Sequence, residues 1–291
     1  MRTRAPGTVT SPEFARGPAA HHSPGVHAAL SVLEALIVAE SLSLSELATQ
    51  LGIPKSSLLR VCSVLTHRGW VTRARDGRYS LGVRAIGLSA HATEYPLVRA
   101  FRAVAPELLT RHNETVCLAV LDGDESTFIA LEETSHPVRL VTNIGDRTAA
   151  FASPSGQVIL ADRARQVVAA EYAGRSLVTP TGRRLRGVEE LLEILEGVRR
   201  NGWAENNDET ALGLYTIAVP IRNAASGVLA ALTMCVPTAR MNTPRREQIL
   251  SDLADAGRRL SEGVAWLPAW NATRAEPSRV RAARSPLPGE S

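Results

Sequence analysis

Basic and hydroxyl side chains near the start of the chain lie at spacings suited to binding nucleic acid. Within residues 54–67, four apolar residues recur at helical spacing, which predicts that they face a core: Leu58, Val61, Cys62 and Leu65. The outward face near the start of this helix then carries Lys55, Ser56, Ser57 and Arg60. On a helix that enters the major groove of DNA, hydroxyls and cations at this end reach base edges and phosphates.

Three arginines follow in a predicted β-hairpin. Residues 70–75 and 78–81 have the composition of strands, and the Asp76-Gly77 pair between them is a strong hairpin signal. We expect this hairpin to present cations that neutralise phosphates or enter a minor groove: Arg73, Arg75 and Arg78.

The elements that position these side chains are also visible in the sequence. Ser43 or Ser45 can cap a short helix that ends near Gly52, and Pro54 opens the helix with the polar outward face. Residues 26–40 carry apolar residues at helical spacing and supply a third helix for the core. Together these segments predict a winged helix-turn-helix that binds double-stranded DNA. The alternative is an ordinary pair of packed helices whose charges are only solvated.

The composition limits the class of protein. With 291 residues the chain is long enough for two domains, its hydrophobic content of 44% is ordinary for a soluble protein, and its net charge is +4. No apolar run approaches the ~20 residues of a membrane helix, and no secretory signal is visible. The cysteines are widely spaced and odd in number, which argues against a disulfide framework: Cys62, Cys117 and Cys235. We expect a cytoplasmic protein that has no membrane partner.

Changes in composition divide the chain into five parts. Residues 1–24 and 268–291 are rich in Pro, Ala and Arg with little to bury, so we expect disordered tails. Residues 25–82 hold the winged helix-turn-helix. Residues 83–96 are predicted to be a linker helix that stops at the proline, and residues 97–267 form a second domain.

The second domain alternates strand pairs with helices, which predicts an α+β fold with a mainly antiparallel sheet. We expect its strands at residues 114–121, 127–132, 138–144, 214–221 and 228–236. We expect its helices at residues 97–112, 153–161, 163–173, 188–201 and 244–266.

Constellations typical of enzymes are absent from the sequence. Ser155 stands in Ser-Pro-Ser-Gly rather than the Gly-x-Ser-x-Gly turn of a hydrolase, and no base is tied to it. The pair His21-His22 has no cysteine partners, so we expect no metal, and no other cofactor is indicated. Two alternatives stay open: an enzyme domain fused to a DNA-binding module, and a regulator gated by oxidation of Cys235.

Several longer segments resemble a known family. Residues 43–71 (SLSELATQLGIPKSSLLRVCSVLTHRGWV) with the following YSLG resemble the DNA-binding half of the IclR family of bacterial transcriptional regulators. In the second half, FASPSGQVILA, NGWAENNDETALGLYTIAVPIRN and GVLAALTMCVPTARM resemble the effector-binding half of the same family. The resemblance extends over residues 26–265.

This resemblance implies a GAF-like effector-binding domain and assembly as a homodimer or a dimer of dimers on a DNA operator. By the family pattern, the pocket for a small-molecule effector is lined by Pro154, Ser155, Gly156, Asn206, Leu214, Thr216, Thr233 and Cys235. Many relatives carry a lysine where this chain has Gln157 and an aspartate where it has Asn206. We therefore expect an organic or aromatic acid held mainly by neutral hydrogen bonds, with backbone N–H groups near residues 153–156 receiving its carboxylate. The implied function is that of a ligand-responsive regulator, more often a repressor.

Overall fold

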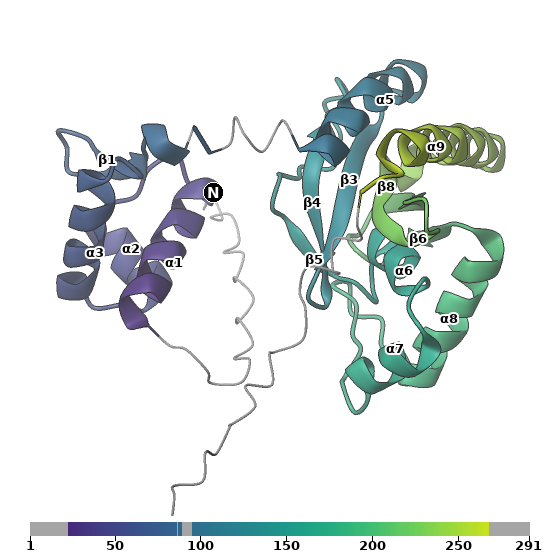
Figure 1. Ribbon diagram of the computed structural model, residues 1–291, viewed down its shortest axis with the longest axis horizontal. Helices are drawn as coiled ribbons and strands as arrows, with labels where there is room; N and C mark the ends of the chain where they lie inside the picture. The colour runs from purple at the N-terminus through teal and green to yellow at the C-terminus, as the bar shows by residue number, and fades with distance from the viewer. Residues whose placement is uncertain (1–22, 86, 89–94, 268–291) are drawn as a thin grey trace, which may run out of the picture. The chain divides into compact units, whose positions relative to one another are not determined.

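The computed structural model describes residues 23–85, 87–88 and 95–267 (Figure 1). The chain divides into two compact units between Ala92 and Thr93. Apart from Ser23 and Pro24, the two predicted tails lie outside the described residues. Of the predicted linker helix, residues 83–85 and 87–88 are helical, while Ile86 and residues 89–94 lie outside the described part.

From Ser23 to Leu81, the first unit contains three helices and a hairpin, as the sequence predicts for a winged helix-turn-helix. Its elements are α1 (Pro24–Val38), α2 (Leu44–Leu51), α3 (Lys55–His67), β1 (Val71–Arg73) and β2 (Tyr79–Leu81). The two strands are antiparallel, with Val71 opposite Leu81. Of the two candidate caps, Ser43 begins α2: its Oγ accepts from the Glu46 N–H at 3.2 Å, and a Glu46 carboxylate oxygen accepts from the Ser43 N–H at 2.7 Å.

The core of this unit lies between the helices and the hairpin. Leu58, Cys62 and Leu65 on α3 are buried, as their spacing predicts, whereas Val61 is only partly buried. They pack with Val32 on α1, Leu47 on α2, and Val71 and Tyr79 on the hairpin. The buried face of α3 therefore packs against α1, α2 and the hairpin, and its polar face points away from this core.

The second unit is built on an antiparallel sheet of six strands in the order β5-β4-β3-β8-β7-β6. The strands are β3 (Thr115–Asp122), β4 (Glu125–Glu132), β5 (Arg147–Ala149), β6 (Ala204–Asn207), β7 (Leu214–Arg222) and β8 (Val228–Pro237). The helices are α5 (Pro96–His112), α6 (Pro154–Leu160), α7 (Arg165–Tyr172), α8 (Val188–Asn201), η1 (Thr238–Arg240) and α9 (Thr243–Val264).

The two faces of this sheet have different cores. One face packs against α5 and α9, which lie side by side, through large residues such as Leu118, Ile217 and Met234 (Figure 1). The other face meets α6 with small residues, among them Ala218 and Ala231. Because side chains alternate along a strand, one sheet provides both a strongly apolar wall and a wall of small and polar groups.

The strand expected at residues 138–144 is wrong: this segment is irregular backbone. Its β-branched residues satisfied the strand pattern, but the backbone is held by side chains instead. The Val138 carbonyl accepts from Arg240 Nη1 at 2.9 Å, and the Asn143 N–H donates to Asp146 at 2.8 Å. The short strands β5 and β6 were not predicted, because three or four residues give too little alternation to indicate a strand.

Candidate functional site

The outward surface of α3 presents the predicted polar residues. Lys55, Ser56 and Arg60 are exposed and Ser57 is half-buried. Within the described residues, neither Lys55 nor Arg60 takes part in an ion pair, so both cations can meet an external anion. Leu59, which is 48% exposed on α3, was not singled out from the sequence, although an apolar side chain on such a surface can contact a thymine methyl group.

The three predicted arginines of the hairpin differ in what they contact. Arg75 is exposed in the turn, and the Arg73 guanidinium lies 5.5 Å from the centre of the Tyr79 ring. Arg78 instead donates to Ser41 Oγ at 2.9 Å and to the Ser41 carbonyl at 2.8 Å. It also forms an ion pair with Glu46 at 3.1 Å. Arg73 and Arg75 are thus directed outward, while Arg78 ties the hairpin to the start of α2.

The predicted effector residues on the sheet lie in one row. Asn206 on β6 is opposite Thr216 on β7, Thr216 is opposite Cys235 on β8, and Cys235 is opposite Thr115 on β3. Directly opposed residues of antiparallel strands point to the same face. Thr233 lies one step along β8 on that face, opposite Cys117. The structure therefore brings together Asn206, Thr216, Thr233 and Cys235, and adds Thr115 and Cys117.

Four side-chain oxygens of this group are buried and have no hydrogen-bond partner among the described residues: Thr115 Oγ1, Asn206 Oδ1, Thr216 Oγ1 and Thr233 Oγ1. A hydroxyl or amide oxygen buried without a partner costs roughly 1–3 kcal/mol. Four such atoms on one small area of a sheet are unusual in a protein interior. This area, which we call the polar row, can bind a polar ligand that supplies the missing hydrogen bonds.

Helix α6 faces the polar row and carries three further predicted residues, Pro154, Ser155 and Gly156, all buried. Ser155 Oγ lies 2.8 Å from Ser126 Oγ on β4. The Asn206 amide nitrogen donates to the Ala152 carbonyl at 3.0 Å and so connects β6 to the turn before α6. A Cβ atom at Gly156 would stand 2.3 Å from the Ala150 backbone, which explains why this position has no side chain.

The remaining predictions for this site fare differently. Leu214 is buried at the end of β7, opposite Pro237. The backbone N–H groups that the sequence offers to a carboxylate are partly engaged, because Gly156 N–H donates to Ser153 Oγ at 3.2 Å and Gln157 N–H to the Ser153 carbonyl at 2.8 Å.

The pKa of Cys117 is raised well above its ordinary value, first by its hydrogen bond with Cys235 and then by burial. The thiol is therefore protonated at neutral pH.

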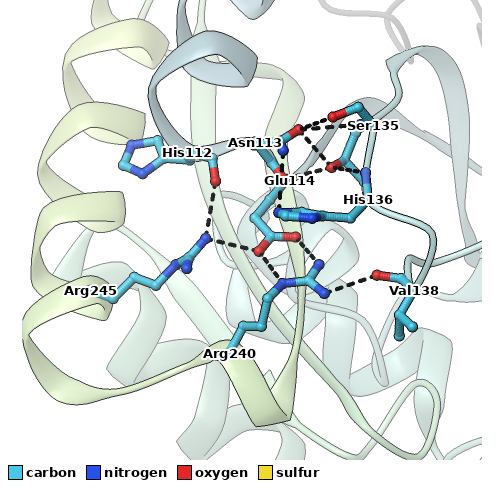
Figure 2. A network of polar contacts seen from close by, with 9 residues as sticks. His112, Asn113, Glu114, Ser135, His136, Val138, Arg240 and Arg245 are labelled. Atoms are coloured by element: carbon cyan, nitrogen blue, oxygen red, sulfur yellow. Dashed lines mark hydrogen bonds and ion pairs between the residues drawn. The ribbon is translucent and has the colours of Figure 1, made fainter.

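A buried ion-pair network is centred on Glu114, and sequence analysis missed it (Figure 2). Glu114, which directly precedes Thr115, is fully buried. Its carboxylate accepts from Arg240 at 2.7 and 2.6 Å and from Arg245 at 2.8 Å. Arg240 also donates to the Val138 carbonyl. The partners are separated by 126 and 131 residues in the chain, so no local pattern could reveal them.

Other surfaces and clusters do not coincide with the predicted site. A groove of about 560 Å³ lies beside α9 and is lined by residues including Trp203, Pro220 and Leu250, none of them a predicted effector residue. Where the chain is described, no three His, Cys, Asp or Glu side chains gather as metal ligands would. No helix of that part combines the length and apolar character needed to cross a membrane.

Comparisons with known proteins point to one family. The profile described as the IclR helix-turn-helix domain matches residues 26–75, and that described as bacterial transcriptional regulator IclR C-terminal matches residues 89–262. The chain is 30% identical over 220 residues to the HTH-type transcriptional regulator KdgR of Escherichia coli (strain K12), covering 75% of this chain and 84% of that protein.

Two further comparisons agree. The chain is 30% identical over 212 residues to the Pca regulon regulatory protein of Pseudomonas putida, covering 71% of each. Its fold is similar to that of an IclR transcriptional regulator from Alicyclobacillus acidocaldarius, with a TM-score of 0.73 and 24% identity over 84% of this chain and 99% of that one.

Proposed function

The chain belongs to the IclR family of bacterial transcriptional regulators, and from this premise we propose that α3 reads a DNA operator while the polar row senses the effector. Members of this family bind DNA operators and respond to small-molecule effectors, and the matched relatives are transcriptional regulators rather than enzymes. We propose that the protein acts in the cytoplasm as a homodimer or a dimer of dimers. We propose that it represses transcription.

The polar outward face of α3 supports the DNA half of this proposal. Ser56, Ser57 and Arg60 would contact base edges, and Lys55 would contact a phosphate. Arg73 and Arg75 would add phosphate contacts from the hairpin. Arg78, which the sequence also predicts to contact DNA, would act by holding the hairpin against α2, since its Nε and Nη2 are engaged by Ser41 and Glu46.

The test is a salt-resolved titration of the protein against DNA directly upstream of its gene. Arg60→Ala should weaken binding to the operator more than binding to unrelated DNA, because a base contact carries sequence preference. Arg75→Ala should weaken both equally and lower the slope of log K against log salt by about 0.9. If Arg60→Ala affects both DNAs equally, the assignment of α3 to base recognition is wrong.

The observation that carries the effector half is the set of four unpaired oxygens of the polar row. An effector bound there would contact four strands and α6 at once. Our hypothesis from the sequence, an organic or aromatic acid held by neutral hydrogen bonds, is one candidate class. A ligand that changes operator affinity should lose that effect in Thr216→Val, while operator binding without ligand stays as in the wild type. An undiminished effect in this variant would place the effector elsewhere.

The redox alternative has a specific structural basis, because Cys235 lies on the same face of the sheet as Cys117, on the neighbouring strand, and raises its pKa. Both side chains are buried, however, and the neutral form of a buried thiol reacts slowly with peroxide. We expect Cys235→Ser to keep the same operator affinity as the wild type before and after peroxide treatment. A peroxide response that this substitution abolishes would favour redox gating over ligand sensing.

A further inference from the structure

We propose that the effector is a small uncharged compound that carries several hydroxyl groups. This inference rests on the proposed function of the polar row and adds to it the charge and the hydrogen-bonding character of the ligand.

The groups that line the polar row are all neutral. Three are threonine hydroxyls, one is the Asn206 amide, and two are the thiols of Cys117 and Cys235. Near it, the hydroxyls of Ser155 on α6 and Ser126 on β4 lie within hydrogen-bond distance of each other, and the buried Ser153 hydroxyl and Gln157 amide are also neutral. No lysine, arginine or histidine belongs to this set of described residues. A carboxylate placed here would lose its hydration and would gain no cation in exchange.

The carboxylates that act on this area make it less suitable for an anion. Two carboxylates, Asp146 and Glu133, act on the Cys117 thiol and contribute to its raised pKa. Two arginines that follow β8 in the chain, Arg240 and Arg245, both contact the Glu114 carboxylate. Arg245 belongs to α9, the helix that packs on the opposite face of the sheet. The local charge therefore disfavours an organic acid in its ionised form.

The direction of the hydrogen bonds points to a ligand with donors. The Asn206 amide nitrogen is already engaged by the Ala152 carbonyl, so its unpaired Oδ1 can only accept. A carboxylate cannot donate to it, whereas a hydroxyl can. The three threonine hydroxyls can each donate or accept, and a ligand hydroxyl can do the same. Hydroxyl groups on the ligand thus match every unpaired atom of the row.

The spacing of the row sets the size of the ligand. Neighbouring strands lie about 4.8 Å apart, so the distance from Asn206 on β6 to Thr115 on β3 is about 14 Å. Thr216 and Thr233 lie between these ends, on the middle strands. A compound with one hydroxyl at one end of a short carbon chain would satisfy a single atom. Several hydroxyls along five or six carbons would reach neighbouring strands together.

The experiment compares matched pairs of compounds that differ in charge. Full-length protein is titrated at neutral pH with D-xylose and D-xylonate, glycerol and glycerate, and 4-hydroxybenzyl alcohol and 4-hydroxybenzoate. Binding is followed by the thermal unfolding midpoint and by calorimetry. We expect the uncharged member of a pair to bind at least tenfold more tightly than its acid. Thr216→Val and Thr233→Val should each weaken that binding about five- to tenfold, as loss of one hydrogen bond predicts.

Thr127→Val is the matched control. Thr127 Oγ1 is also buried without a partner, but Thr127 pairs with Val120, which belongs to the core on the α5 and α9 face. This variant should bind the ligand as the wild type does.

The other possible outcomes contradict either the ligand class or the location of the effector site. If an acid binds as tightly as its uncharged partner and Thr216→Val weakens it, the ligand class is wrong and the proposed site stands. If binding is unchanged in both threonine variants, the polar row is not the effector site. If no uncharged compound binds at millimolar concentration while operator binding is intact, this inference fails and the DNA-binding function is unaffected.

Discussion

Replacing Glu114 with alanine should destabilise the second unit far more than any exposed ion pair could. The carboxylate is fully buried and accepts three hydrogen bonds from two arginines, each between 2.6 and 2.8 Å. Removing one partner of a buried ion pair costs about 3–5 kcal/mol, because the other charge is left without compensation. Arg240 and Arg245 have side chains that are 24% and 30% exposed, so they can recover part of their hydration.

We therefore expect a loss of about 3 kcal/mol for Glu114→Ala, at the lower end of that range. Glu114→Gln keeps the shape and one acceptor oxygen, and should lose about 1–3 kcal/mol. The assay is urea denaturation of the full-length protein followed by circular dichroism, with the free energy of unfolding taken from the transition of the second unit. A double-mutant cycle with Arg240→Ala should show strong coupling between the two residues.

Glu107 provides the matched control. It also contacts two arginines, Arg111 at 3.2 Å and Arg259 at 2.7 Å, but its side chain is 49% exposed. Glu107→Ala should change the free energy of unfolding by less than about 1 kcal/mol, since solvent screens exposed pairs. If Glu114→Ala and Glu107→Ala have equal effects, burial does not set the strength of these ion pairs, and the reasoning is refuted.

Three further predictions concern single positions. Arg60→Ala should reduce operator affinity by about 1–3 kcal/mol in a gel-shift titration, with a much smaller loss on unrelated DNA. Gly156→Ala should destabilise the second unit by about 1–3 kcal/mol or more in thermal unfolding, because its Cβ would overlap Ala150; a wild-type midpoint would contradict this. Burial lowers the pKa of His112 below 6.5 despite the Asp252 carboxylate, so the folded state favours the neutral ring. The contribution of the neutral ring to the free energy of unfolding should be fully present above pH 6.5 and should be lost as the pH falls through the lowered pKa. Urea titration of the wild type and of His112→Gln at each pH should show this dependence in the wild type and not in the variant.

Local patterns in the sequence predicted most helices and strands. They failed where contacts between residues far apart in the chain determine the backbone conformation. The Ser43 cap, the amphipathic α3 and the β7–β8 pair follow from spacing alone, because each is stabilised by neighbours in the chain. Residues 138–144 have a strand-like composition, yet Arg240 and Asp146 hold their backbone outside the sheet. The sheet part of the proposed effector site was inferred from family resemblance, and the strand register then added Thr115 and Cys117 to the proposal. Neither residue could be placed there before the strand order was known.

The alternation of residues along β8 has a consequence for how the protein can evolve. Met234 and Val236 face the large apolar core, while Thr233 and Cys235 face the polar row. Under the proposed function, selection for folding acts on one set and selection for ligand recognition acts on the other, although the two sets are interleaved in a single strand. A lineage can then replace Thr233 or Cys235 and acquire a new inducer while the packing of α5 and α9 is inherited unchanged.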